Sequence, residues 1–230
     1  MASGEFRLRV AYGKTGRLRW LSHLELARAL ERGVRRAGLP YAATHGFSPH
    51  MKIAFGPALP VGTAGTREYF DVWLAEFLGV RKALERLKES LPADLQVIDA
   101  VYVSDRRPSL TAGTLIGEYD VCVEGEEVGT EEVQTALGKL TASGELVVEH
   151  KGKTKVFDLA RSLPKEPRAR EVDGQLRVAV TVRMGPEGSL RPEVLLRAAF
   201  DTSMLQSAVI EVTRTDTFIE TEEGVWSRPA

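Results

Sequence analysis

Apolar and polar positions alternate through four segments of the first hundred residues and recur with helical spacing in two others. The segment FRLRVAYG, residues 6–13, sets apolar side chains against Arg7 and Arg9, which predicts a strand with one buried face. The segments MKIAFG, REYFDVWLA and LQVIDAVYV predict three more strands. VRKALERLKESL predicts an amphipathic helix, which Pro92 ends.

The segment LSHLELARALERGVRRAGLP contains the clearest helical pattern of the chain. Ser22 followed three residues later by Glu25 forms a capping box, which predicts that the helix begins there. Gly38 and Pro40 predict where it stops. Its apolar face is formed by Leu26, Ala29, Leu30, Gly33, Val34 and Ala37.

The resulting order over residues 5–103 is β-α-β-β-α-β, which is typical of a ferredoxin-like fold. Residues 104–113, SDRRPSLTAG, interrupt the pattern and are predicted to be a linker. We therefore expect an α+β protein of two tandem ferredoxin-like halves, the second irregular: domain 1–103, linker 104–113 and domain 114–230.

The second half repeats the pattern imperfectly, with one extra strand. TLIGEYDVCVEG, QLRVAVTVRM and AVIEVTRTDTFIET predict strands, and ELVVEH with KTKVFDLA predicts a hairpin around HKGK. TEEVQTALGKLTAS predicts a helix capped by Thr130, and RPEVLLRAAF predicts a short helix with Pro192 in its first turn.

Composition narrows the class of protein. Of the 230 residues, 43% are apolar and 27% charged, which is ordinary for a chain that buries a core. There is no run of about 18 apolar residues, so no membrane span is expected. The first residues lack the apolar core of a signal peptide, and the single cysteine, Cys122, fits a reducing compartment. We expect a cytoplasmic protein without a membrane partner.

The net charge of −1 conceals an uneven distribution. Residues 1–60 hold ten basic and three acidic residues, a net charge of +7, whereas the rest of the chain carries −8. A second basic run, KGKTKVFDLARSLPKEPRAR, occupies residues 151–170. Concentrated cations on a near-neutral protein favour a polyanion site, although a solvated surface with scattered ion pairs would look similar.

RNA binding requires cations along a phosphate track and exposed aromatic rings for stacking. Arg28, Arg32, Arg35 and Arg36 share one face of the predicted helix. Trp20 and Tyr41 could stack on bases but could equally be core residues, and Phe47, between Gly46 and Ser48, is the least core-like aromatic. The predicted RNA-binding residues are Lys14, Arg17, Arg19, Arg32, Arg35, Arg36, His45, Phe47, His50 and Lys52.

Catalysis and metal binding have weaker support in the sequence. His45 and His50 lie five residues apart in a loop, no HxH or HxxxH pair occurs, and His23 follows the cap residue, so no metal site is assigned. A loop histidine with Lys14, Lys52 or Arg17 would suit metal-independent RNA cleavage, but any loop histidine would fit equally well. No catalytic residue and no cofactor is predicted.

Several segments resemble the radical SAM-linked protein family, a domain of unknown function encoded beside or fused to radical SAM proteins. The resemblance runs through LSHLE, RALERGVRRAGLP, GFSPHMK and LPVG, continues at KVFDLA and RPEVLL, and ends at VTRTDTFI. It implies a radical SAM enzyme as partner. Genes of such proteins tend to lie near ribonuclease and ribosomal-protein genes, which points toward RNA. The three closely spaced cysteines of a radical SAM cluster are absent, so the chain resembles the partner and not the enzyme.

These observations favour a non-catalytic RNA-binding or substrate-presenting partner of a radical SAM enzyme. One alternative is a metal-independent endoribonuclease, because the predicted architecture is similar to that of CRISPR RNA-processing endoribonucleases. Their glycine-rich loop near the C-terminus is not visible here, and fold analogy does not carry function. The other alternative is a protein-interaction module without RNA affinity, in which the arginine face meets an acidic protein.

Overall fold

The structure is a computed structural model that describes residues 4–112, 114–124, 129–150, 152–185, 188–200 and 208–229. Its contacts divide the chain into two compact units. The N-terminal unit comprises Met1–Gly113 with Arg228–Ala230, and the C-terminal unit comprises Thr114–Ser227. Both units mix helices with strands, and every strand pair within a unit is antiparallel.

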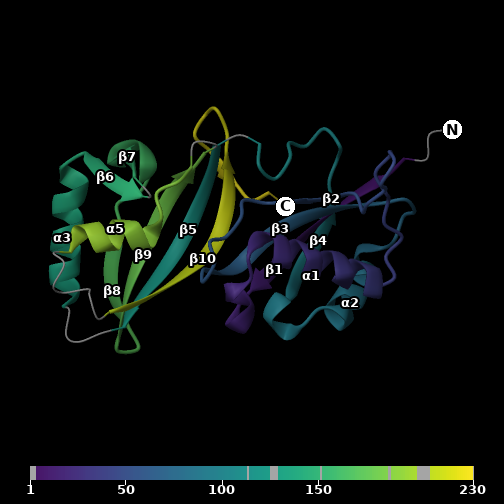
Figure 1. The fold of residues 1–230 in the computed structure, drawn as a ribbon, viewed down its shortest axis with the longest axis horizontal. Helices are drawn as coiled ribbons and strands as arrows, with labels where there is room; N and C mark the ends of the chain where they lie inside the picture. The colour runs from purple at the N-terminus through teal and green to yellow at the C-terminus, as the bar shows by residue number, and fades with distance from the viewer. Residues whose placement is uncertain are drawn as a thin grey trace. The chain divides into compact units, whose positions relative to one another are not determined.

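The N-terminal unit contains its strands and helices in the predicted order. They are β1 (Phe6–Lys14), the 3₁₀ turn η1 (Gly16–Trp20), α1 (His23–Arg36), β2 (Ile53–Phe55), β3 (Ala64–Leu74), α2 (Val80–Ser90), the 3₁₀ turn η2 (Ala93–Leu95) and β4 (Val97–Tyr102). Val72 of β3 pairs with Leu8 on one side and Ile53 on the other, so the strand order is β4-β1-β3-β2. The helices α1 and α2 lie on one face of this sheet (Figure 1).

The start of α1 confirms the predicted capping box. The Ser22 side chain accepts a hydrogen bond from the backbone of Glu25, and the Glu25 carboxylate accepts one from the backbone of Ser22 at 2.8 Å. Hydrogen bonds from Ser22 hold the pKa of the Glu25 carboxyl below its ordinary value. Gly38, at φ +60°, ends the helix in the left-handed conformation that glycine adopts without strain.

The core of the N-terminal unit lies between its helices and the sheet. Leu26, Leu30 and Val34 of α1 pack with Leu8, Val10, Phe70 and Val72 of the two central strands. The prediction that β1 has a single buried face is wrong, because Arg7 and Arg9 on its other face are buried as well. Local alternation cannot reveal this burial, since the groups that cover the arginines come from distant parts of the chain.

The C-terminal unit also has a sheet with helices on one face (Figure 1). Its elements are β5 (Thr114–Glu124), α3 (Thr130–Ala142), β6 (Glu145–His150), β7 (Lys153–Asp158), α4 (Leu159–Ser162), β8 (Arg168–Val172), β9 (Gln175–Met184), α5 (Pro192–Ala199), β10 (Val209–Glu220) and β11 (Trp226–Ser227). The main sheet has the order β10-β5-β9-β8, with β11 paired to β10, and β6 and β7 form a separate hairpin.

Three predictions in this unit need comment. Pro192 begins α5 as expected. Thr130 is the first helical residue of α3 and not its cap, since the N-cap is Gly129 and no side chain caps the helix. The predicted strand KTKVFDLA stops at Asp158, because the Asp158 side chain accepts a hydrogen bond from the backbone of Arg161 and starts α4. The predicted hairpin around HKGK is confirmed by the pairing of β6 with β7, and Lys151 of that segment lies outside the described residues.

The two units share a strand order. If β6, β7 and α4 are set aside as an insertion, β5, α3, β8, β9, α5 and β10 follow one another as β1, α1, β2, β3, α2 and β4 do. Each sheet then places its fourth, first, third and second strands side by side. In the parts of the chain that the structure describes, no helix is long and apolar enough to cross a membrane.

Candidate nucleic-acid interface

The loop of residues 44–50 projects from a fixed base in the N-terminal unit. Ala43 pairs with Met51, and the backbone N–H of Thr44 donates to the His50 carbonyl at 2.7 Å. The His50 N–H in turn donates to the Thr44 hydroxyl at 3.1 Å. Phe47 is fully exposed at the tip, and His45 and His50 are exposed beside it. The loop therefore presents an aromatic ring to solvent from a hydrogen-bonded base.

The helices α1 and α2 form one surface of the N-terminal unit, which we call the cationic helix layer. Together they carry eight basic and four acidic residues. Arg28, Arg32, Arg35 and Arg36 are all exposed. Arg35 lies 3.7 Å from Glu31 in an exposed pair, which screening makes weak. The excess of cations is thus available to an anionic ligand.

Two arginines of this layer also hold the helices together. The Arg36 guanidinium donates to the Ser90 carbonyl at 2.6 Å, and Arg86 donates to the Gly38 carbonyl at 3.1 Å. Arg36 thus satisfies a carbonyl in the last turn of α2, where four carbonyls lack helical partners, and Arg86 satisfies one just beyond the end of α1. Arg36 has a structural role in addition to its predicted role in binding.

The structure separates the remaining predicted residues from this layer. Lys14 is buried and its ammonium donates to the Leu21 carbonyl at 2.9 Å. Lys52 pairs with Glu5, and its Nζ lies 5.1 Å from the centre of the Trp73 ring. Trp73 alternates with the core residues Val72 and Leu74, so Lys52 lies on the sheet face away from the helices.

Arg17 and Arg19 lie on η1, ahead of the first turn of α1. The Arg17 side chain is exposed, and the guanidinium of Arg19 lies 5.3 Å from the Trp20 ring. Trp20 is itself largely exposed and packs against Gly62, where an added Cβ would come within 3.0 Å of the ring. The predicted set therefore contains a group on α1, a loop that follows it, and a separate group on η1.

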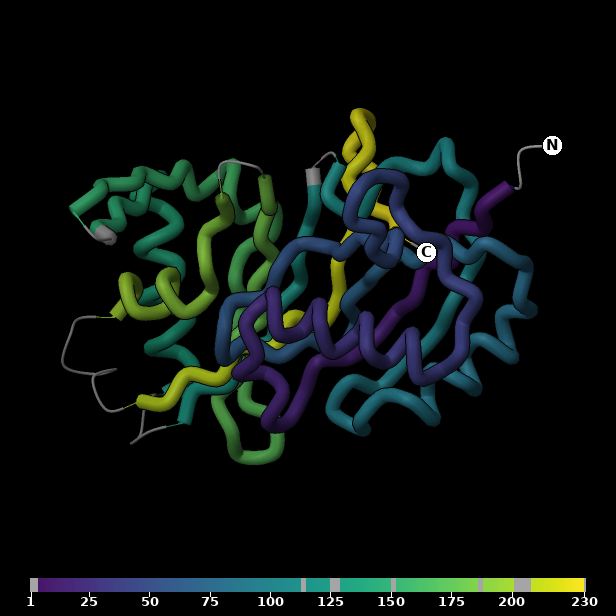
Figure 2. Tube along the Cα trace, turned by 45° about the vertical axis from the view of Figure 1, so that its right-hand side comes forward, coloured from purple at the N-terminus to yellow at the C-terminus, as the bar shows by residue number. Residues whose placement is uncertain are grey.

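A buried polar cluster on the other sheet face was missed by the sequence analysis. Asp71 accepts hydrogen bonds from Arg7, at 2.6 and 2.9 Å, and from Arg9, at 2.7 and 2.9 Å. Arg7 also donates to the Arg107 carbonyl at 2.8 Å, and Arg9 to the Pro229 carbonyl at 2.6 Å. Figure 2 shows the yellow C-terminal end of the chain beside the purple first strand.

This cluster decides which surface of the N-terminal unit is open. Residues 107–108 and 229 lie over the sheet face opposite the helices, and Leu110 packs there with Ala11 and Tyr69. RNA-binding sheets of the βαββαβ kind stack bases on aromatic residues of the exposed sheet face. Here the chain itself covers the part of that face around Asp71, so the cationic helix layer, the 44–50 loop and the exposed group on η1 remain accessible to a ligand.

His23, His45 and His50, the histidines whose side chains are described, are not shown to form a reactive centre. The ring of His23 packs edge-on against Phe55 at 5.7 Å, and His45 and His50 face solvent. Among the residues that are described, no group of three or more histidine, cysteine or acidic side chains could hold a metal ion. Cys122 is buried in β5, and this burial raises the pKa of its thiol, which disfavours the reactive thiolate.

Comparison with known families gives one match. Residues 7–192 match the family described as "Uncharacterized protein conserved in bacteria (DUF2344)". The match covers β1 to the start of α5 and includes the 44–50 loop and the cationic helix layer. No curated protein matches the chain.

Proposed function

The chain belongs to a family of uncharacterized proteins conserved in bacteria, and from that starting point we propose that it binds RNA through its N-terminal unit. In this proposal it is a non-catalytic, cytoplasmic partner that presents RNA, or a substrate carried by RNA, to a radical SAM enzyme. The cationic helix layer holds the phosphate backbone, and the 44–50 loop provides a stacking ring.

The observation that carries the proposal is the division of charge between the units. The N-terminal unit contains 18 basic and 11 acidic residues, whereas the C-terminal unit contains 13 basic and 21 acidic residues. Within the N-terminal unit, exposed arginines at positions 28, 32, 35 and 36 follow one helix face. Neutralisation of phosphates by such cations dominates the affinity of proteins for nucleic acids.

Phe47 supports the RNA proposal over other polyanions. A fully exposed aromatic ring on a hydrogen-bonded loop suits stacking on an unpaired base, which contributes about 1–3 kcal/mol per base. His45 and His50 are exposed in the same loop and can donate hydrogen bonds to phosphate or base atoms. A sulfated polysaccharide would use the arginines but would gain nothing from the ring.

The radical SAM part of the proposal rests on the sequence resemblance of LSHLE, GFSPHMK and the later segments. A single cysteine cannot hold the iron–sulfur cluster that radical SAM chemistry uses, so a partner must supply the cluster and S-adenosylmethionine. The shared strand order of the two units supports the further proposal that they are tandem ferredoxin-like repeats, the second carrying an insertion.

The test is salt-dependent binding of tRNA and rRNA fragments by two charge-matched variants. Arg32→Glu with Arg35→Glu alters the cationic helix layer, and Lys139→Glu with Arg197→Glu makes the same charge change at exposed sites of the C-terminal unit. The first variant is expected to weaken RNA affinity at least about tenfold and to lower the slope of log affinity against log salt concentration by about 2. The affinity of the second variant is expected to stay within about twofold of the wild type.

Equal losses of RNA affinity in both variants would mean that only the net charge of the protein matters. That result would overturn the assignment of RNA binding to the cationic helix layer. RNA cleavage without a partner that disappears in His45→Ala or His50→Ala would favour the endoribonuclease alternative. Retention of a radical SAM enzyme without RNA affinity would favour the protein-interaction module.

A further inference from the structure

Trp20 is exposed on a turn whose other apolar residues pack inward. Leu18 and Leu21, which lie on either side of it in the chain, pack against the core of the N-terminal unit. Trp20 is instead 61% exposed, whereas Trp73 and Trp226 are both half-buried. Its indole leaves unburied the large apolar area that an aromatic side chain otherwise adds to a core. Trp20 is thus the tryptophan whose ring is most open to a ligand.

The turn that carries Trp20 is fixed on both sides. The backbone N–H of Thr15 donates to the Asp94 carbonyl at 2.9 Å, which ties the start of η1 to η2. The buried ammonium of Lys14 donates to the Leu21 carbonyl at 2.9 Å, which fixes the backbone just after Trp20. A ligand that contacts the ring therefore does not have to order the turn first, which lowers the cost of binding.

Gly62 supports the ring from a neighbouring loop. Its N–H donates to the Arg19 carbonyl at 3.0 Å, so the loop and the turn are bonded to each other. A Cβ added at Gly62 would lie 3.0 Å from the Trp20 ring, and the φ of +89° there also favours glycine. The Arg19 guanidinium lies 5.3 Å from the ring centre, and Trp20 is 61% exposed with Arg19 in this position. The indole is held by the protein and is still open to a planar group.

Charged groups of both signs lie near Trp20. Those on η1 and in the turns on either side of it are Lys14, Arg17, Arg19, Glu25 and Asp94. Both carboxylates are engaged with the backbone, because Asp94 accepts from the Arg17 N–H at 3.2 Å and Glu25 accepts from the Ser22 N–H at 2.8 Å. Stacking uses the flat face of a base and does not require a local excess of cations. The ring therefore suits a base, and phosphates are left to the exposed arginines of α1.

Trp20 and Phe47 lie at opposite ends of the N-terminal unit. Gly62, which supports Trp20, comes just before the first residue of β3. Ala42, just ahead of the loop that carries Phe47, donates its N–H to the Trp73 carbonyl near the end of β3. In the chain η1 precedes α1 and the loop follows it (Figure 1). The 14 residues of α1 span about 21 Å, the length of about six nucleotides at about 3.4 Å each.

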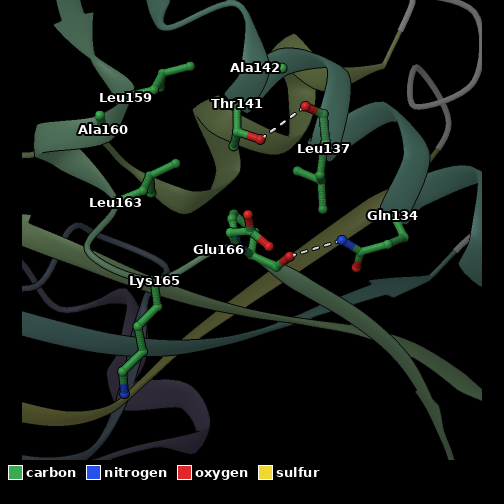
Figure 3. A pocket seen from close by; sticks show the side chains of 11 residues that line it. Gln134, Leu137, Thr141, Ala142, Leu159, Ala160, Leu163, Lys165 and Glu166 are labelled. Carbon is green, nitrogen blue, oxygen red and sulfur yellow. Dashed lines mark hydrogen bonds between the residues drawn. The ribbon is translucent and has the colours of Figure 1, made fainter.

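The cavity of the C-terminal unit does not offer a comparable site for a nucleotide. It has a volume of about 320 Å³ beside α3 and α4, and Figure 3 shows Leu137 facing Leu159 and Leu163 across it. Among the residues that line it, the one cation is Lys165, which is turned toward Glu118 at 2.9 Å. These lining residues thus supply an apolar wall without a cation for a phosphate.

We propose that Trp20 is a second stacking position of the RNA site and that the ligand is an unpaired RNA segment that runs along α1. One base stacks on Trp20, another stacks on Phe47, and the backbone between them contacts the α1 arginines. In a duplex the bases are paired and stacked on one another, so two rings this far apart both engage bases only in a single strand. The inference rests on the proposed function and adds to it the class of RNA.

The test compares a ten-nucleotide uridine oligomer, a three-nucleotide uridine oligomer and a ten-base-pair RNA duplex at one salt concentration. Trp20→Leu is expected to weaken the affinity for the ten-nucleotide oligomer at least about fivefold and to leave the affinity for the duplex within about twofold of the wild type. Trp20→Phe keeps a ring and is expected to lose less than about threefold. The three-nucleotide oligomer is too short to reach both rings, so the wild type is expected to bind it at least about tenfold more weakly than the longer one.

The matched control is Phe77→Leu. Phe77 is 65% exposed, similar to Trp20, but it packs against Phe6 and Tyr102 and has no role in the proposed site. Its loss is expected to leave the affinity for every probe within about twofold of the wild type. Thermal unfolding of each variant shows whether the fold is kept.

A second measurement uses the wild-type chain and does not depend on a variant. Photocrosslinking of a ten-nucleotide 5-bromouridine oligomer, followed by trypsin, is expected to label two peptides. They are residues 20–28, which begin with Trp20, and residues 37–52, which contain Phe47.

Unchanged affinity of Trp20→Leu for the longer oligomer, while Arg32→Glu with Arg35→Glu still weakens it, would overturn this inference and leave the proposed function standing. Equal losses for oligomer and duplex in Trp20→Leu would overturn it as well, because the ring would then not distinguish unpaired bases. So would unchanged RNA affinity together with the loss of a bound protein, which would make Trp20 a protein contact. Absence of RNA affinity in the wild type would overturn the proposed function itself and this inference with it.

Discussion

Asp71 is the one carboxylate that two buried arginines of the N-terminal unit share. Asp71→Asn keeps the volume of the side chain but leaves Arg7 and Arg9 without a buried counter-charge. We expect a loss of about 3–5 kcal/mol in the free energy of unfolding, measured by urea titration. Glu85→Gln, which removes an exposed pair with Arg81, is the control and should change it by less than about 1 kcal/mol. An equal loss of unfolding free energy in both variants would show that the buried cluster stabilises the fold no more than an exposed ion pair does.

The lowered pKa of Glu220 predicts that the free energy of unfolding depends on pH. Hydrogen bonds from Arg183, at 2.8 and 3.0 Å, hold the pKa of its carboxyl below the ordinary value of 4.5, and Trp226 adds another. A carboxyl with a lowered pKa in the folded state stabilises the fold above its unfolded pKa, and this contribution is lost as the pH falls through the folded value. The unfolding free energies of the wild type and Glu220→Gln should therefore differ most near pH 7 and converge below about pH 4.5.

The control for this measurement is Glu223→Gln at an exposed neighbouring position. Its free energy of unfolding should stay within about 0.5 kcal/mol of the wild-type value at every pH. A wild-type advantage over Glu220→Gln that persists unchanged to pH 3 would contradict the assigned cause.

For single residues, the sequence predicted the contacts of side chains whose partners are near in the chain, and it failed for side chains whose partners are distant. Ser22 and Glu25 are three residues apart, so their reciprocal hydrogen bonds could be predicted. Arg9 meets Asp71 and the Pro229 carbonyl across 62 and 220 residues, so the alternation of β1 wrongly predicted a solvated arginine face. An available signal was Asp71 itself, an acid between the apolar residues Phe70 and Val72 of this strand.

Among the elements, α1 and α3 contain glycines in opposite surroundings. Gly33→Ala would place a Cβ 2.3 Å from the buried Leu91 side chain, so that side chain or the helix must shift and the melting temperature should fall. Gly138→Ala meets open space and should stabilise the protein by about 1 kcal/mol. Thermal unfolding of the two single variants measures the difference, and an equal shift in both would show that helix propensity alone decides the outcome.

Helices and strands were predicted well where one period persists over many residues. The 14 residues of α1 and the alternation of β9 are such cases. The run 151–170 was harder because β7, α4 and β8 divide it into pieces of six, four and five residues. Such short pieces carry little periodic signal, and the start of α4 is decided by a single side chain, Asp158.

Across the whole molecule, the charge asymmetry was visible in the sequence, but the surface that carries it was not. Lys14 and Lys52 contribute to the basic excess of residues 1–60, yet one is buried and the other is paired with Glu5. The arginines of α1 remain exposed because helical spacing keeps them opposite the apolar face. Only the fold distinguishes cations that meet solvent from cations that meet the protein.

The last residues of the chain are predicted to stabilise its first strand. Removal of residues 228–230 deprives the buried Arg9 guanidinium of the Pro229 carbonyl, which should cost at least about 1–3 kcal/mol and speed hydrogen exchange of the β1 amides. Pro229→Ala keeps the carbonyl and should behave as the wild type. Normal protection of β1 in the truncated chain would contradict this role.

The hydrogen bond between Arg9 and Pro229 also bears on the order of events during synthesis. The two residues are 220 positions apart, and at about 5–20 residues per second the ribosome needs roughly 11–44 s to add the second after the first. Through that interval the guanidinium of Arg9 lacks the Pro229 carbonyl as an acceptor. Because Pro229 belongs to the N-terminal unit, this unit is completed only after the C-terminal unit has been translated, and a nascent chain that stops before Pro229 lacks the carbonyl that accepts from Arg9.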